Sequence, residues 1–167
     1  NILVNTGSLV EGTNSYVGGF VGHSGEGSTS YTNCRVENLN VKSPIYVGGF
    51  MGILHYGNIV DNCHVVNSTV TKTITAEAEL NITKKYSIGG IAGVHGTYEQ
   101  SATIKNSSFT GTLVNTCDPA TDWSTVHSGL VGLCYNSSTP YVENLDIYTN
   151  NYMNGALVVD PSAAEGE

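Results

Sequence analysis

Four residues of the kinds used in hydrolytic chemistry each stand two positions after an asparagine in this sequence. They are Arg35, His64, Ser108 and Asp146. If the four asparagines occupy equivalent positions of a repeat, these side chains would form one row on an outward-facing surface. A serine beside a histidine and a carboxylate is the set used in nucleophilic catalysis.

The surroundings of this row argue against an active site. No glycine-flanked nucleophile motif accompanies Ser108, Arg35 is the only arginine, and the acidic residues are scattered along the chain. Enzymes that cleave polysaccharides need clustered carboxylates for acid and base catalysis. We therefore predict a protein that is not an enzyme, and keep a carbohydrate-active enzyme as a less favoured alternative.

A metal site has one weak candidate in the sequence. Asp118 and Asp122 lie four residues apart in a segment that contains Pro119, and carboxylate oxygens suit Ca²⁺. Two carboxylates in such a loop more often cap turns. The sequence therefore predicts no metal site and no cofactor. Asp118 and Asp122 are the weak candidate for binding Ca²⁺.

The four cysteines leave two interpretations open. Cys34 and Cys63 each follow an asparagine, so equivalent positions on neighbouring strands would place their backbones about 4.8 Å apart. That separation allows a disulfide, but two small hydrophobic residues stacked in a column fit equally well. Cys117 and Cys134 form a second candidate pair. No Cys-x-x-Cys spacing suggests zinc or redox chemistry.

Four triplets have the sequence of an N-glycosylation acceptor. Chance alone produces about this number in a chain so rich in Asn, Ser and Thr, and the triplets matter only in a eukaryotic secretory context. They begin at Asn67, Asn81, Asn106 and Asn136.

A repeat must position all of these residues, and glycine marks it. Segments rich in glycine occur at Val17–Gly22, Val47–Gly52, Ile88–Gly93 and Ser128–Gly132. Glycine weakens a strand, so its recurrence indicates close approach by a neighbouring backbone or ring. The residues that we assign to this repeated core are Gly18, Gly19, Phe20, Gly22, Gly48, Gly49, Phe50, Gly52, Gly89, Gly90, Ile91, Gly93, Gly129, Leu130 and Gly132.

A second motif follows each glycine segment at a nearly constant distance. It is an asparagine between strand-like residues, 10 to 13 positions after the last glycine of the segment. Asparagine tolerates left-handed backbone and can satisfy backbone groups with its amide, so we expect a ladder of corner residues. The four corners are Asn33, Asn62, Asn106 and Asn144.

These two motifs predict an all-β parallel β-helix, or β-solenoid, of about four stacked coils. The units lie near residues 16–45, 46–86, 87–125 and 126–149, within one domain of residues 1–160 followed by a tail at 161–167. Strict alternation over residues 73–83 predicts one inserted strand. Ile2, Leu3 and Val4 are spaced like the end of a preceding unit, so we expect a segment of something longer.

Charge excludes one class of partner. The formal net charge is −8 and only six residues are Lys or Arg, whereas nucleic-acid binding needs clustered cations. There is also no apolar run of the length that spans a membrane. The polar surface must instead be built from hydroxyl and amide side chains.

The repeat resembles the GLUG motif, named for its Gly-Leu-hydrophobic-Gly core. The likeness is strongest in Val17–Gly22 with Asn33–Val36 and in Val47–Gly52 with Asn62–Val65. GLUG motifs occur in tandem in bacterial surface adhesins and in non-catalytic parts of secreted immunoglobulin A peptidases. The resemblance implies a right-handed parallel β-helix or a related solenoid on an extracellular or cell-surface protein, and brings no catalytic residues.

Two functions follow as expectations. In the first, the chain is a non-enzymatic, adhesin-like scaffold that mediates attachment to a host or matrix protein or a glycan, or forms a stalk. In the second, it is a subunit that assembles end to end into an extracellular filament, because a solenoid has strand edges at both ends.

Overall fold

The chain is built from β-strands that pair in parallel. The computed structural model describes residues 2–5, 9–12, 16–25, 27–73, 86–97, 102–116, 125–136, 147–149 and 152–159. Every regular element in this part is a strand, and the strands form four sheets. No helix in the described ranges has the length and apolar character needed to cross a membrane.

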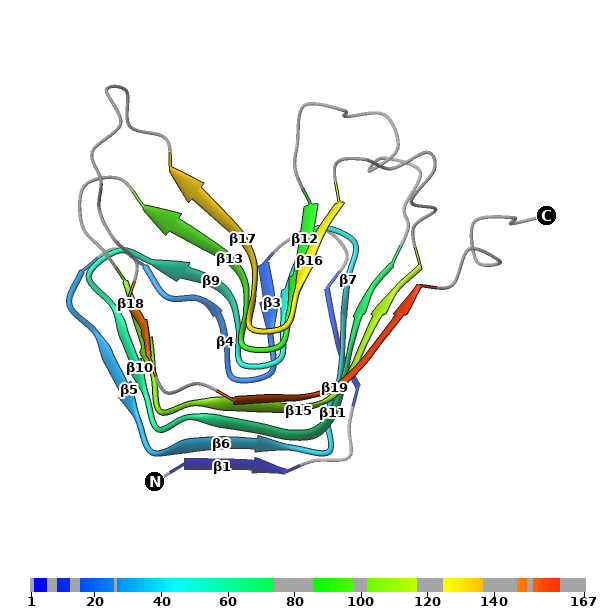
Figure 1. Ribbon diagram of the computed structural model, residues 1–167, viewed down its shortest axis with the longest axis horizontal. Coiled ribbons are helices and arrows are strands. Elements are labelled where there is room, and N and C mark those ends of the chain that lie inside the picture. Colours follow the sequence, from blue (N-terminus) through cyan, green and yellow to red (C-terminus); the bar gives the residue numbers. More distant parts are fainter. Residues whose placement is uncertain are drawn as a thin grey trace.

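One sheet forms a floor that bends upward at one end (Figure 1). We call it the floor sheet, and its inward residues include Val36, Val65 and Phe109, all fully buried. Alternation of buried and more exposed side chains along each strand reflects the two faces of a sheet. Its strands are β1 (Ile2–Asn5), β6 (Cys34–Glu37), β11 (His64–Lys72), β15 (Ser108–Asn115) and β19 (Tyr152–Val159), with β2 (Leu9–Glu11) and β7 (Asn40–Ser43) at the bent end.

A second sheet, which we call the side sheet, rises from the other end of the floor (Figure 1). Its inward column contains Val60 and Ile104, both fully buried, and the partly buried Tyr31. The strands are β5 (Ser30–Thr32), β10 (Ile59–Asp61), β14 (Thr103–Lys105) and β18 (Ile147–Thr149).

Two further sheets form a V whose tip points at the floor (Figure 1). The glycine segments lie at this tip. Each segment joins one strand of the first arm to one strand of the second. The first arm has β3 (Tyr16–Gly18), β8 (Tyr46–Gly48), β12 (Tyr86–Gly89) and β16 (Thr125–Ser128). The second arm has β4 (Val21–His23), β9 (Met51–His55), β13 (Ala92–Thr97) and β17 (Val131–Asn136).

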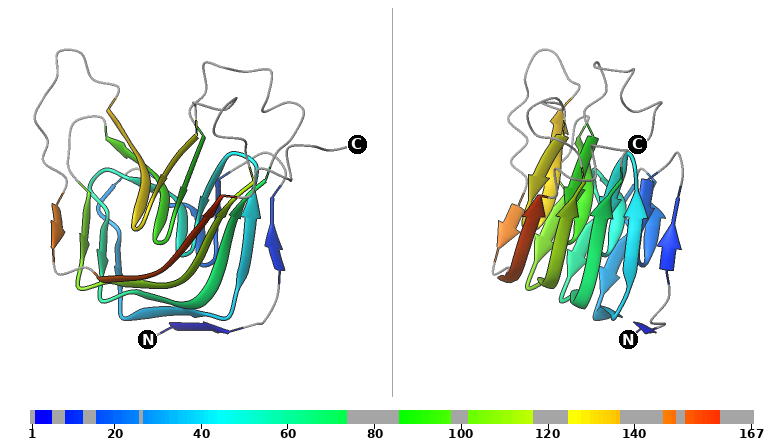
Figure 2. Two further views of the ribbon diagram at one scale, coloured as in Figure 1. Left: turned by 45° about the vertical axis from the view of Figure 1, so that its right-hand side comes forward. Right: turned by 90° about the vertical axis from the view of Figure 1, so that its right-hand side faces the viewer.

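Successive units contribute successive strands to each sheet, which Figure 2 shows as parallel rows when the molecule is turned. In the first arm, Val17 pairs with Val47, Val47 with Ile88 and Ile88 with His127. This is the register in which the glycine segments were aligned by sequence. The predicted all-β class and parallel pairing are therefore confirmed.

The large apolar residues at the tip of the V lie above one another. Backbone hydrogen bonds run from Phe20 N to Phe50 O, from Phe50 N to Ile91 O and from Ile91 N to Leu130 O, at 2.9, 3.0 and 2.8 Å. The rings of Phe20 and Phe50 stack with centroids 4.9 Å apart. Phe50 and Ile91 are fully buried, whereas Phe20 and Leu130, at the two ends of the column, are partly buried.

Glycine is required here because backbones touch backbones. A Cβ on Gly48 would overlap Met51 O of the opposite arm and lie 2.6 Å from Gly93 N of the next unit. A Cβ on Gly90 would overlap Gly129 O and the ring of Phe109 on the floor sheet. The glycines therefore allow the two arms to close on each other and the tip to reach the floor.

The predicted inserted strand at residues 73–83 lies outside the described residues except for Thr73, as does the tail at 161–167. The fourth unit also extends further than its predicted end at residue 149, because β19 pairs with β15 over the whole range from Tyr152 to Val159.

We predict that Gly48→Ala destabilises the protein by at least about 2 kcal/mol, because its new methyl group has no space and its neighbours are backbone atoms that cannot rotate away. Gly22→Ala is the matched control, since its Cβ would meet only Tyr16 O, at 3.0 Å. Urea unfolding followed by circular dichroism measures both. Equal losses for the two variants would contradict this account of the glycines.

Candidate functional site

The candidate site is the corner where the side sheet meets the floor sheet. Asn33, Asn62 and Asn106 stand at this step in three successive units, with φ angles of 56°, 52° and 52°. This left-handed backbone costs most residues free energy, and asparagine is among those that adopt it most readily. The corner positions predicted for the first three units are thus occupied by asparagines that make the chain turn.

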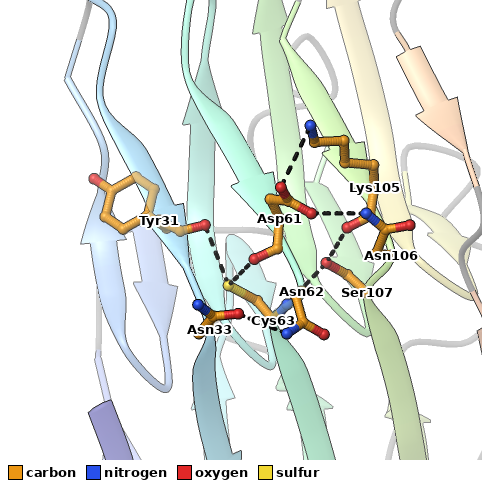
Figure 3. Close-up of polar contacts among 8 residues, drawn as sticks. All are labelled: Tyr31, Asn33, Asp61, Asn62, Cys63, Lys105, Asn106 and Ser107. Atoms are coloured by element: carbon orange, nitrogen blue, oxygen red, sulfur yellow. Dashed lines mark hydrogen bonds and ion pairs between the residues drawn. The ribbon is translucent and has the colours of Figure 1, made fainter. Parts of the chain in front are cut away.

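The amide side chains at the corner form a partial ladder, which Figure 3 shows. Asn62 Nδ2 donates to Asn33 Oδ1 at 2.6 Å. In the next unit, Asn106 Nδ2 donates instead to Asp61 Oδ1 at 2.8 Å. Asn62 Oδ1 faces His64 Nε2 instead, 2.9 Å away.

Asp61 has a second partner in the ammonium group of Lys105, with Nζ 3.3 Å from Oδ2 (Figure 3). The hydrogen bond from Asn106, and then the hydrogen bond and positive charge of Lys105, lower the pKa of the Asp61 carboxyl below its usual value. Both side chains of the pair are partly exposed to solvent, so its contribution to stability is small.

A column of small side chains lies behind the corner. Cys34, Cys63 and Ser107 are all buried, and Ser107 Oγ accepts the Cys63 backbone N–H at 3.1 Å. Cys63 Sγ lies 3.4 Å from Tyr31 O and 3.5 Å from Asp61 O, two acceptors that share its single proton (Figure 3). Burial raises the pKa of the Cys63 thiol to about 12. It is therefore protonated at neutral pH.

Both cysteines of this column are free thiols. The Cys34–Cys63 disulfide, one of the two interpretations of the sequence, is absent, and the structure has the other arrangement, two buried residues in one column. Each sulfur has a backbone carbonyl to which it donates, Thr32 O in the case of Cys34. Each thiol thus has a hydrogen-bond acceptor without forming a disulfide.

The fourth predicted corner, Asn144, lies outside the described residues. In the described part of the chain, Thr103, Ile104 and Lys105 pair with Ile147, Tyr148 and Thr149. Ser108, at the start of β15, pairs with Tyr152 at the start of β19. The strands on either side of the third corner are therefore continued by β18 and β19.

The same register gives the outward row. Arg35 pairs with His64, His64 with Ser108 and Ser108 with Tyr152, so the fourth position of the row belongs to Tyr152 and not to Asp146. Tyr152 is 59% exposed. As far as the structure describes this row, it holds a serine and a histidine but no carboxylate.

His64 is nevertheless held by two side chains. Its Nδ1 lies 2.8 Å from Ser108 Oγ, and its Nε2 lies 2.9 Å from Asn62 Oδ1. Partial burial, and then the positive charge of Arg35, lower the pKa of His64 below its usual value. The Arg35 guanidinium also forms an ion pair with Glu37 on the same strand.

A second left-handed bend follows the first by five residues and was not predicted. Asn38 and Asn67 have φ angles of 55° and 48°. Asn38 N donates to Val66 O at 3.0 Å, and the buried Ser68 Oγ accepts the Leu39 N–H at 3.2 Å. The signal was present in the sequence, because an asparagine follows Asn33 and Asn62 at the same offset.

Asn58 is a second residue that the sequence analysis missed. It is 1% exposed, and its Nδ2 donates to Gly25 O and His55 O at 2.9 and 3.0 Å while its Oδ1 accepts the Thr29 N–H at 3.1 Å. One amide thus joins the connections that lead from β4 and β9 to the side sheet. A lone asparagine beside a glycine gives no warning of this role.

The remaining candidate residues divide by how far the structure describes them. Among the glycosylation triplets, Asn67 is exposed at its bend and Asn106 donates to Asp61. Only the backbone of Asn136 and of Cys134, both in β17, is described. Within the described residues no three His, Cys, Asp or Glu gather to hold a metal ion. Asn81, Cys117, Asp118, Asp122, Asn144 and Asp146 lie outside the described residues.

We predict that the stability of the protein falls as the pH is lowered, in two separable steps. Both His64 and Asp61 have a lowered pKa in the folded state, so each stabilises the fold above its ordinary pKa and loses that contribution as the pH falls through its folded pKa. His64→Gln should remove the step below about pH 6.5, and Asp61→Asn the step below about pH 4.

Urea unfolding at a series of pH values measures both steps, and each variant serves as the control for the other. If His64→Gln keeps the full pH dependence of the parent between about pH 7 and about pH 5, the assignment to His64 is wrong.

Comparison with known proteins identifies one unit of the repeat. Residues 86–114 match the family model described as the GLUG motif. No curated protein and no solved structure matches the chain. The matched segment runs from β12 to β15 and contains Ile88–Gly93 and Asn106, whereas the sequence resemblance was placed most strongly in the first two units. This chain carries a GLUG motif, and its matched residues are the third of the units that the strand register aligns.

Proposed function

We propose that the chain is a β-solenoid of about four coils that serves as a non-enzymatic, adhesin-like scaffold on an extracellular or cell-surface protein. The observation that carries the proposal is a register that continues from unit to unit in all four sheets, as in the pairs Val17 with Val47 and Val47 with Ile88. Stacked units of this kind make rigid, elongated surfaces that suit attachment or a stalk. The GLUG motif at residues 86–114 supports the same proposal.

The uncharged polar side chains on the surface of the chain support contact with a host or matrix protein or a glycan. Only 12% of the residues are charged, and the corner and the outer face of the floor sheet present amide and hydroxyl groups. Asn33, Asn62 and Ser108 are examples. Such groups donate and accept hydrogen bonds without a fixed charge, which suits neutral polar partners.

A group of rings in the first two units adds contact area. Tyr16 stacks on Tyr46 and on His23, with centroids 5.1 and 5.4 Å apart, and His23 meets His55 edge to face at 4.9 Å. Tyr16 is 38% exposed. Tyrosine offers a rigid apolar body with a polar tip, the combination favoured at recognition surfaces.

A binding and turnover assay tests the scaffold proposal. We expect the purified chain to bind at least one member of a panel of matrix proteins and glycans, and to release no sugar from a panel of polysaccharides. The Gly48→Ala variant is the matched control, because it keeps the surface residues and disturbs the stack. Binding no greater than that of the control would contradict attachment, and release of sugar would favour the carbohydrate-active alternative.

The second candidate function is end-to-end assembly into an extracellular filament. It is favoured by strand edges: in the described pairings β3, β4 and β5 each have a neighbour on one side only. An unpaired edge offers backbone donors and acceptors to another chain. A second copy would supply the missing neighbour with the same parallel register.

Sedimentation velocity and electron microscopy over a concentration series test this alternative. Assembly predicts rods that lengthen with concentration, and predicts that Tyr16→Lys on the edge strand β3 shortens them, because an edge lysine opposes strand addition. A parent protein that stays monomeric over the whole series would eliminate the filament and leave the scaffold proposal standing.

A further inference from the structure

The outer face of the floor sheet contains a chain of hydrogen bonds that crosses three units. Asn62 Nδ2 donates to Asn33 Oδ1 at 2.6 Å. Asn62 therefore turns its Oδ1 toward His64, whose Nε2 lies 2.9 Å away. An oxygen acceptor at that position requires the proton of His64 to be on Nε2.

The tautomer decides what the other ring nitrogen can do. With the proton on Nε2, His64 Nδ1 has a lone pair, and this atom lies 2.8 Å from Ser108 Oγ. Ser108 is then the donor, and its hydroxyl proton points at a base. A nucleophile within hydrogen-bond reach of a base, with the base oriented by a third group, is the arrangement that activates serine.

We propose that Ser108 is a nucleophilic serine that accepts an acyl group from activated esters, with His64 as the base and Asn62 as the positioning residue. This inference does not rest on the proposed scaffold function, because it depends only on contacts between β11, β15 and the corner. It describes a single acylation of the protein and not a turnover.

The acylation step balances without any further reactant. Ser108 Oγ attacks the ester carbonyl carbon, a bond forms between Oγ and that carbon, and the hydroxyl proton moves to His64 Nδ1. The bond between the carbonyl carbon and the leaving oxygen then breaks, and that oxygen takes the proton from Nδ1 and departs as an alcohol, or as a phenol when the donor is an aryl ester. His64 Nε2 keeps its proton and its bond to Asn62 Oδ1 throughout.

The backbone around Ser108 narrows the class of acyl donor. Ser108 N donates to Cys63 O at 3.1 Å within the sheet, so it does not stabilise a developing oxyanion as a free backbone N–H would. Donors with good leaving groups, such as aryl esters, need that stabilisation least. The exposed ring of Tyr152 occupies the next position of the row and offers apolar surface to an aryl group.

The exposure of Ser108 and the surroundings of His64 both support the proposed reaction. Ser108 and His64 are both partly exposed on the outer face, so a small ester can reach the hydroxyl. Partial burial and the charge of Arg35 lower the pKa of His64, which keeps the imidazole neutral at neutral pH and able to take a proton.

Treatment of the native chain with p-nitrophenyl acetate and with an alkyl fluorophosphonate, followed by peptide mapping by mass spectrometry, tests the proposal. We expect one modification, at Ser108. Ser30 is the internal control, because it is exposed on β5 and its register neighbour is Ile59. His64→Gln should slow modification of Ser108 about 100-fold.

Asn62 is tested by two variants that both tolerate its left-handed backbone. Asn62→Gly removes the acceptor and should slow acylation, while Asn62→Asp restores an acceptor and should recover it, a difference that a purely structural role would not produce. Circular dichroism confirms that each variant is folded. Modification of Ser108 no faster than that of Ser30, or unchanged in a folded His64→Gln chain, would overturn the proposal.

Discussion

Contact between backbones at the tip of the V is the constraint on which the rest of this structure depends. A Cβ on Gly48 would overlap backbone atoms of the opposite arm and of the next unit, and a Cβ on Gly90 would overlap Gly129 O of the next unit and the Phe109 ring of the floor sheet. The tip therefore reaches the floor sheet, and Phe50 and Ile91 at the tip are fully buried in the core. Closing the arms therefore creates the core, and the core in turn holds the side sheet and the floor in register.

The corner solves the second geometric problem, which is how the chain leaves one sheet and enters the next at the same place in every unit. Left-handed asparagines at positions 33, 62 and 106 turn the backbone, and their amides bond between units. The buried column of Cys34, Cys63 and Ser107 fits behind this turn because each residue is small and finds a carbonyl partner. At the corner, the outward positions therefore require asparagines that adopt left-handed backbone, whereas the inward positions require small residues.

Much of this arrangement could be predicted from sequence, because the glycine segments and the first three asparagines report constraints on the backbone itself. The sequence placed Asp146 in the outward row by counting from Asn144, whereas the register places Tyr152 there. Loop length is weakly constrained, so only the long pairing of β15 with β19 gives this position. The choice between disulfide and thiol also depends on three-dimensional contacts, since the Cys63 thiol has hydrogen-bond acceptors in the carbonyls of Tyr31 and Asp61.

The hydrogen bonds of His64 could not be predicted from the sequence for a related reason. The sequence placed His64 and Ser108 in one row but could not give the direction of either side chain.

The division between inward and outward positions has a consequence for how such a protein can change over evolutionary time. Inward positions of the floor sheet repeat apolar residues, Val36, Val65 and Phe109, whereas the outward row holds a guanidinium, an imidazole, a hydroxyl and a phenol at Arg35, His64, Ser108 and Tyr152. Point mutations in that row leave the buried face intact, so each unit can diverge in surface chemistry while its neighbours keep theirs. Duplication of a unit followed by such drift would generate new combinations of groups at fixed separation, and so allow recognition properties to vary on an unchanging frame.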